Sequence, residues 1–198
     1  MTDHDLVLAS TSAYRRALLS RLGLPFRAVA PACDEEQLKD PALTPRALAD
    51  TLAEAKARSI ADQQPQATVI GSDQVAALQI GSSWQILGKP GTAERAVEQL
   101  SLMSGRSHLL ITAMVVIHQG RVFRHTDQTR LTMRDLHRDQ LARYVATDKP
   151  LDCAGAYKLE AQGIALFDRI ASDDHSAITG LPLVALARIL TECGFQFP

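Results

Sequence analysis

Residue types suited to phosphate and metal chemistry follow several apolar segments of this sequence. The apolar run Thr68–Ser72 leads directly into Asp73, and the acidic triplet Asp34, Glu35 and Glu36 follows another apolar run. Carboxylates hold hard divalent cations through oxygen, and one of them can act as the base that deprotonates a water molecule. Combined with lysines and arginines, they predict attack by water on a phosphoanhydride without a nucleophilic side chain.

Cationic and hydroxyl side chains occur at further predicted loops and helix starts. Ser10, Ser12 and Arg15 surround the start of a predicted helix, where free backbone N–H groups and a guanidinium fork suit an anion. Taken alone, they are more typical of a capping serine beside solvated arginines. Lys56 borders the apolar stripe of another predicted helix and should not point to bulk water. Lys89 lies between Gly88 and Pro90, a pattern that more often marks a plain turn than a ligand contact.

The acidic residues have structural interpretations as well. An acidic triplet is usually solvated surface, and Asp73 could form an Asx turn or cap a helix. The segment after Asp73, VAALQI, favours a strand and not a helix, which weakens the cap interpretation.

Two sharper phosphate-site motifs are excluded. Six residues separate Gly81 from Gly88, and Pro90 occupies the position where a P-loop needs Ser or Thr. Val75 stands where an aspartyl nucleophile of the haloacid dehalogenase kind needs a second aspartate. A covalent phosphoaspartate is therefore not expected.

Composition restricts the remaining classes of protein. The 198 residues are 46% hydrophobic with a net charge of −1, which fits one α/β domain over residues 1–198 and gives no basic field for long nucleic acid. The acidic N-terminus matches neither a signal peptide nor a membrane span, so we expect a cytoplasmic protein. Cys33, Cys153 and Cys193 lie outside any CxxC pattern and no HExxH spacing occurs, so we expect structural thiols and no histidine-based metal site.

The predicted elements place the polar residues at strand ends and helix starts. We expect strands at residues 5–9, 26–30, 68–72, 75–79 and 164–167, a hairpin of residues 108–117 and 122–133 that turns at Gln119 and Gly120, and helices at 13–22, 45–59, 93–103, 141–145 and 182–193. Strands that alternate irregularly with helices, with one long hairpin, predict a mixed sheet with helices on its faces.

Eight segments together resemble the Maf family of nucleoside triphosphate pyrophosphatases. In chain order they are LVLASTSAYRRALLSRLGLPF, DEE, AEAKA, VIGSDQV, GKP, SGRSH, PLDCAGAYKLEAQG and ITGLPLVAL. The resemblance implies a twisted mixed sheet related to that of inosine triphosphate pyrophosphatase, two lobes around a cleft, and a homodimer. It also implies cleavage of a nucleoside triphosphate between the α and β phosphates with Mg²⁺ or Mn²⁺.

The resemblance assigns roles to individual residues. It makes Asp73 the proton acceptor for the attacking water, with metal contacts shared between Glu35 and Asp73. The residues that it places around the triphosphate are Ser10, Ser12, Arg15, Lys56 and Lys89.

Three positions indicate a subgroup of the family. Tyr14, Gln74 and Glu160 are similar to the subgroup that hydrolyses 7-methyl-GTP, although Ala13 and Tyr14 stand where proline and tryptophan are more usual. An aromatic face suits the positive charge of N7-methylguanine, and a carboxylate can accept from guanine N1–H and the exocyclic amine. The alternatives are a dTTP and UTP pyrophosphatase of the same family and a nucleotide-binding regulator of septum formation.

Overall fold

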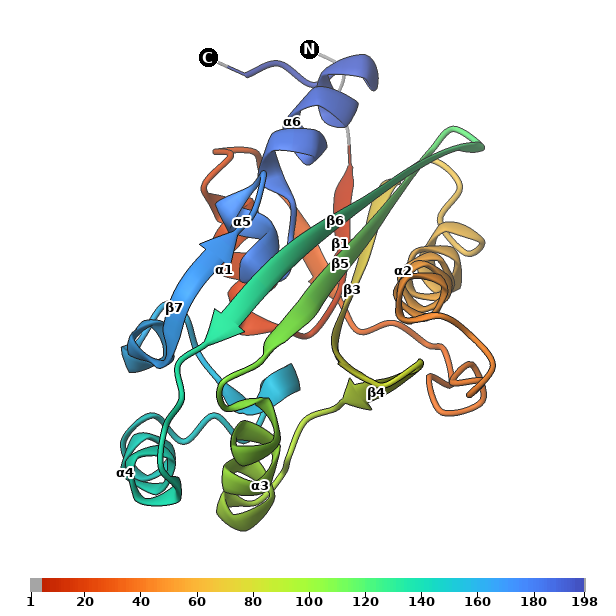
Figure 1. Ribbon diagram of the computed structural model, residues 1–198. Coiled ribbons are helices and arrows are strands. Elements are labelled where there is room, and N and C mark those ends of the chain that lie inside the picture. The colour runs from red at the N-terminus through yellow and green to blue at the C-terminus, as the bar shows by residue number, and fades with distance from the viewer. Residues whose placement is uncertain (1–4, 198) are drawn as a thin grey trace. The chain divides into compact units, whose positions relative to one another are not determined.

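The computed structural model describes residues 5–197, in which helices alternate with seven strands (Figure 1). The strands are β1 (Leu6–Ala9), β2 (Arg27–Val29), β3 (Thr68–Ile80), β4 (Ser83–Leu87), β5 (Ser107–His118), β6 (Arg121–Met133) and β7 (Phe167–Ala171). The helices are α1 (Ala13–Ser20), α2 (Pro45–Ala61), α3 (Ala93–Met103), α4 (Arg138–Asp148), α5 (His175–Ile178) and α6 (Leu183–Glu192), with 3-10 turns η1 (Ala154–Ala156) and η2 (Gln162–Leu166).

The sheet is mixed, as the sequence predicts. Its strand order is β2-β1-β3-β5-β6-β7, and β4 pairs with β3 outside this path. β1 is parallel to β2 and β3, whereas β4 is antiparallel to β3 and β7 is antiparallel to β6. β5 and β6 form the predicted long hairpin (Figure 1). Gln119 and Gly120 both have positive φ, as a two-residue type I′ turn requires.

The chain divides into two compact units. Unit 1 comprises Met1–Asp73, Thr112–Asp127 and Asp174–Pro198, and unit 2 comprises Gln74–Ile111 and Gln128–Asp173. Among residues 5–197, no helix is long and apolar enough to cross a membrane.

The core of unit 1 lies on one face of β1 and β3. Leu8 and Ile70 pack there in one buried cluster with Leu19 of α1 and with Leu186 and Leu190 of α6. Because side chains alternate along a strand, residue 72 of β3 points to this face, and residues 71 and 73 point to the opposite one.

Unit 2 contains a second set of packed elements. α3 lies against α4 and against η1, and β4 forms a hairpin with the second half of β3. The rings of buried His108 and Tyr157 and of partly buried Phe167 form a cluster, with centroid separations of 5.0 to 5.8 Å. Aromatic rings at this spacing pack favourably in tilted or edge-to-face arrangements.

Two predictions about elements are wrong. The strand expected at residues 164–167 is mostly the 3-10 turn η2, and β7 begins only at Phe167. A Cβ on Gly163 would lie 2.4 Å from the carbonyl oxygen of Lys158, so the chain turns tightly here. The strand expected to end at Ser72 continues through Ile80 as a single strand, because the polar side chains of Ser72 and Asp73 have hydrogen-bond partners inside the fold.

The three cysteines are free thiols, as predicted. Cys193 is buried, and Cys33 and Cys153 are partly buried. Burial raises the pKa of all three thiols, to about 12 for Cys153. Since the thiolate is the reactive form, these cysteines are poor nucleophiles.

Candidate active site

The candidate site depends on a close contact between α2 and β3. α2 starts as predicted, with Thr44 as its N-cap and Pro45 at its first position. A Cβ on Gly71 would lie 2.3 Å from the carbonyl oxygen of Ala53 and 2.6 Å from the backbone nitrogen of Ala57. Only glycine permits this approach, and the small residues of the AEAKA segment permit it from the helix side.

The contact brings Lys56 beside two carboxylates. Its Nζ lies 2.5 Å from Asp73 Oδ1 and 3.1 Å from Glu35 Oε1. Lys56 is 6% exposed and Asp73 is 8% exposed, whereas the side chain of Glu35 is 42% exposed. The prediction that Lys56 avoids bulk water is confirmed. One ammonium between two carboxylates leaves a net negative charge, which suits an additional cation.

Asp73 occupies the middle of a strand and not a strand end. Its Oδ1 accepts the hydrogen bond from Lys56, and no hydrogen bond from another residue reaches Oδ2 within the described chain. The interpretations of Asp73 as an Asx turn or a helix cap are therefore wrong. A rigid strand that presents one engaged and one available oxygen is a suitable geometry for a base acting on water.

The segment after β1 carries the predicted phosphate loop. Ser10 is buried, and its Oγ accepts a hydrogen bond of 3.1 Å from the backbone nitrogen of Ser12. Ser12 is the N-cap of α1 and accepts from the backbone nitrogen of Arg15 at 3.4 Å. The capping role considered from the sequence is confirmed for Ser12, and it leaves the helix N-terminus accessible to an anion through other N–H groups.

Arg15 is partly buried in unit 1 and is bonded to its backbone, so it is not a fully solvated surface arginine. Its Nε donates to the carbonyl oxygen of Gly180 at 2.9 Å. Burial lowers the pKa of Arg15, and the negative charges of Asp73 and Glu35 oppose this shift. The guanidinium remains protonated in any case. Arg15 therefore brings positive charge into electrostatic range of both carboxylates.

Sequence reasoning missed Ser72 and Gly180. Ser72 is fully buried, and its hydroxyl contacts the carbonyl oxygens of Ala113 at 2.8 Å and Gly180 at 3.0 Å. Gly180 lies in the segment before α6. The carboxylate of Asp174 fixes this segment by accepting hydrogen bonds from Ser176 and from the backbone N–H of Val184. The sequence signals that could have found them were a serine inside an apolar strand and a glycine before Leu181–Pro182. Neither signal indicates which distant residue is the hydrogen-bond partner.

The other predicted residues lie at several places. Tyr14 is partly buried in the first turn of α1, in unit 1. In unit 2, Gln74 is partly buried in β3, and Glu160 is exposed in the turn between η1 and η2. Lys89 is exposed in the loop after β4, and this loop is fastened by a hydrogen bond of 3.1 Å from Gln99 to the carbonyl of Gly88.

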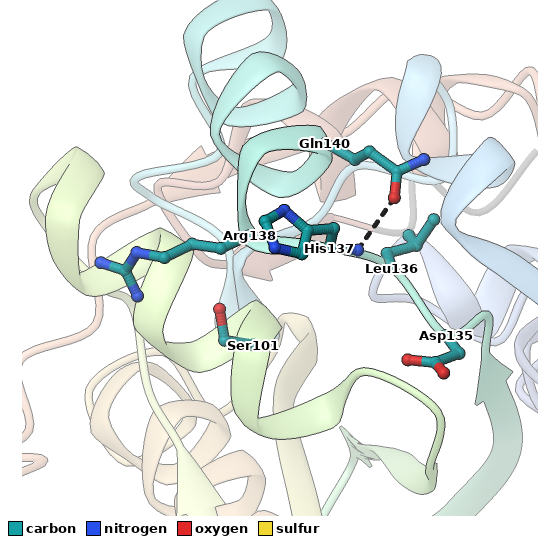
Figure 2. A pocket seen from close by; sticks show the side chains of 6 residues that line it. All are labelled: Ser101, Asp135, Leu136, His137, Arg138 and Gln140. Carbon is teal, nitrogen blue, oxygen red and sulfur yellow. Dashed lines mark hydrogen bonds between the residues drawn. The ribbon is translucent and has the colours of Figure 1, made fainter.

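A surface hollow in unit 2 contains none of the predicted site residues. It lies between α3 and the start of α4 (Figure 2). His137 caps α4, and its backbone N–H donates to Gln140 Oε1 at 2.8 Å. The local side chains thus complete the capping box themselves. The charged residues that line the hollow, Asp135 and Arg138, have opposite signs. The hollow therefore lacks the uniformly positive lining that would suit a nucleotide.

The carboxylates provide only part of a metal site. Within residues 5–197, no group of three or more His, Cys, Asp or Glu side chains is arranged around one point. Glu35 and Asp73, joined by one ammonium, are nevertheless the kind of oxygen donors that Mg²⁺ uses. This ion commonly binds one or two carboxylates and takes its other ligands from water and substrate phosphates. The donor set therefore fits a cation that binds together with a triphosphate.

Comparison with known proteins identifies relatives over nearly the full length. The family profile described as Maf-like protein matches residues 5–193. A protein of Bdellovibrio bacteriovorus named 7-methyl-GTP pyrophosphatase is 48% identical over 190 residues, which cover 96% of this chain and 97% of that protein. A protein of Aromatoleum aromaticum with the same name is 47% identical over 98% of this chain and 97% of its own.

A solved structure supports the fold. A HAM1 protein from Coxiella burnetii superposes with a TM-score of 0.51 at 14% sequence identity, covering 96% of this chain and 99% of that one. At this identity the similarity concerns the fold alone.

Proposed function

This chain belongs to the Maf family, and we propose that it is a nucleoside triphosphate pyrophosphatase that hydrolyses 7-methyl-GTP to 7-methyl-GMP and pyrophosphate. The names of relatives that share almost half of its residues support the substrate. The observation that carries the chemistry is the buried contact of Lys56 with Asp73 and Glu35. We treat residues 1–198 as one pyrophosphatase domain.

Asp73 is the general base in this proposal. Its Oδ2 takes a proton from the attacking water while the water oxygen bonds to the α-phosphorus, and the bond from that phosphorus to the bridging oxygen of the β-phosphate breaks. Lys56 holds the carboxylate in place through Oδ1. No covalent enzyme intermediate is needed. The raised pKa values of the three thiols agree with this, because they leave no reactive thiolate.

Cationic and hydroxyl groups bind the triphosphate. Ser10, Ser12 and Arg15 form the phosphate loop at the start of α1, and Arg15 brings a fork of N–H donors that matches phosphate oxygens. Lys56 and Lys89 add ammonium groups. Glu35 and Asp73 would hold Mg²⁺ or Mn²⁺, which when bound supplies charge neutralisation for the phosphate oxygens.

Tyr14, Gln74 and Glu160 read the base in this proposal. The tyrosine ring stacks on the cationic N7-methylguanine, and Glu160 accepts from the N1–H and the exocyclic amine. Uracil and thymine lack that pair of donors. Glu160 therefore accepts fewer hydrogen bonds from them than from N7-methylguanine, which disfavours them.

We further propose that the protein forms a homodimer and works in the cytoplasm, where nucleoside triphosphates are available. The family membership supports both statements. Light scattering on the purified protein tests the dimer, and a mass of one chain over the micromolar range would rule it out under those conditions.

The test of function is pyrophosphate release from purified protein with Mg²⁺ and, separately, Mn²⁺. 7-Methyl-GTP, GTP, dTTP, UTP and CTP are compared at equal concentrations, with an EDTA control. We expect 7-methyl-GTP to be cleaved fastest and EDTA to stop the reaction. Preference for dTTP or UTP would refute the substrate and favour the other subgroup. Tight nucleotide binding without release would favour the regulator of septum formation.

A further inference from the structure

The carbonyl oxygen of Gly180 receives two hydrogen bonds from residues that are far apart in the sequence. Arg15 Nε donates to it at 2.9 Å, and Ser72 Oγ lies 3.0 Å from it, with the one hydroxyl proton of Ser72 shared between this oxygen and the Ala113 carbonyl oxygen at 2.8 Å. A carbonyl oxygen has two lone pairs, so both bonds can form together. Gly180 thus connects the arginine of the phosphate loop to the strand that carries Asp73.

The geometry around Gly180 leaves little freedom. Its φ is +110°, and a Cβ at this position would lie 3.3 Å from Arg15 Nε. Ser72 is fully buried, and its neighbour Asp73 points to the opposite face of β3, where Lys56 binds it. Adjacent residues of one rigid strand therefore hold the carboxylate on one side and the support of Arg15 on the other.

We propose that Ser72 is a positioning residue that sets the direction of the Arg15 guanidinium through the Gly180 carbonyl. This inference rests on the proposed function. Because the guanidinium is planar, the bond from Nε fixes the plane in which its two Nη groups lie. Within residues 5–197, the Nη groups make no hydrogen bond or ion pair, so they are available to phosphate oxygens. A shifted Gly180 carbonyl would turn them away.

The chain offers a matched control for this bond. Thr112 Oγ1 donates to the carbonyl oxygen of Ala177 at 2.8 Å, so it also fastens the segment before α6 through a buried hydroxyl. The Ala177 carbonyl also accepts from the backbone N–H of Gly180 at 2.9 Å. Thr112→Val therefore removes a comparable bond whose acceptor is a different carbonyl from the one that Arg15 contacts.

The experiment is a double-mutant cycle on kcat/KM for pyrophosphate release. We expect Ser72→Ala to lower kcat/KM about tenfold in the native background but less than twofold in an Arg15→Lys background. Thr112→Val should have the same effect in both backgrounds. If the effects of Ser72→Ala and Arg15→Lys multiply, the positioning role is wrong, and Ser72 only stabilises the fold.

A substitute variant and a binding measurement complete the experiment. Ser72→Cys, whose thiol is a much weaker donor than the hydroxyl, replaces Ser72→Ala in the cycle if the alanine variant does not fold. Its effect on kcat/KM should be smaller than that expected for alanine and should again be lost in the Arg15→Lys background. Affinity for inorganic tripolyphosphate, measured by calorimetry on the same variants, gives a readout that does not depend on hydrolysis. Absence of turnover in the wild type would refute the proposed function. Additive effects on tripolyphosphate affinity would refute the role of Ser72.

Discussion

One buried cluster in unit 1 and one in unit 2 contain ionisable side chains, and they differ in whether an opposite charge is present. In unit 1, Lys56 lies within 3.1 Å of both Asp73 and Glu35, so buried charge has an opposite charge beside it. In unit 2, His108 is 1% exposed, and its Nε2 lies 2.9 Å from the hydroxyl of Tyr157. Burial lowers the pKa of His108 to about 4 and raises the pKa of Tyr157.

In the proposed function, this difference separates a reactive cluster from a structural one. Without a counter-charge, burial favours the neutral form of each side chain. His108 and Tyr157 therefore neither gain nor lose a proton near neutral pH. Charges that are kept by pairing can instead bind a polyanion and a metal ion. Burial alone therefore does not distinguish a candidate site in this protein, whereas the buried ion pair of Lys56 and Asp73 does.

Removing the carboxylate of unit 1 should have the largest effect. Asp73→Asn keeps the shape of the side chain but removes the base, so we expect kcat to fall about 1,000-fold while nucleotide affinity changes little. Pyrophosphate release and calorimetry measure the two quantities. Glu36→Gln, in the same acidic triplet as Glu35 but exposed and paired with Lys39, is the control and should retain activity. Equal losses of affinity and rate would contradict the role of Asp73 as a base.

Protonation of the unit 2 cluster should appear as a pH dependence of stability. Above pH 6.5, the ordinary pKa, His108 is neutral in both the folded and unfolded states. Between pH 6.5 and about 4 only the unfolded state binds the proton, so the free energy of unfolding should fall as the pH falls. The loss attributable to His108 approaches about 3 kcal/mol below this window.

Urea denaturation of the wild type and His108→Gln at several pH values measures this contribution. The difference in the free energy of unfolding between the two proteins should change across the window and stay constant above it. Parallel curves throughout would show that His108 does not carry the pH dependence.

Adding a side chain at Gly71, where β3 contacts α2, should lower both stability and activity. A Cβ at Gly71 clashes with the backbone of α2, so Gly71→Ala should lower the free energy of unfolding by about 2 kcal/mol and separate Lys56 from Asp73. Gly88→Ala is the control for stability, because a Cβ there has no neighbour within 4 Å. A Gly71→Ala protein with native stability and full activity would show that this close approach is dispensable.

The smallest expected effect concerns the exposed carboxylate of unit 2. Glu160→Gln should shift the kcat/KM ratio of 7-methyl-GTP to UTP about tenfold toward UTP, because one charged acceptor is replaced by a neutral amide. The exposed Glu98 of α3 offers a matched substitution, Glu98→Gln, that should leave the ratio unchanged. If both variants keep the ratio, Glu160 does not read the base.

Local signals in the sequence predicted the elements that depend on near neighbours. The caps at Ser12 and Thr44 and the turn at Gln119 and Gly120 are formed by residues within a few positions of one another, and all three occur as expected. The burial of Lys56 followed from the helical period of α2.

The middle of β3 could not be predicted in the same way. Ser72 and Asp73 looked like a strand end because buried polar groups are costly without partners. Their partners are Lys56, Ala113 and Gly180, which lie 17, 41 and 108 residues away from them along the chain. Sequence spacing carries no information about hydrogen bonds of this range, so the continuation of the strand was missed.

The sequence by itself determined the family, the mixed α/β class and the kinds of residue available for phosphate chemistry, because these follow from residue types and their order. Only the tertiary structure decided which buried or partly buried charged side chains have a bonding partner. Lys56 remains paired because Gly71 lets α2 approach β3, and Arg15 is directed by a carbonyl that is 165 residues away. Both arrangements depend on contacts between distant segments, and such contacts form only when the chain has folded.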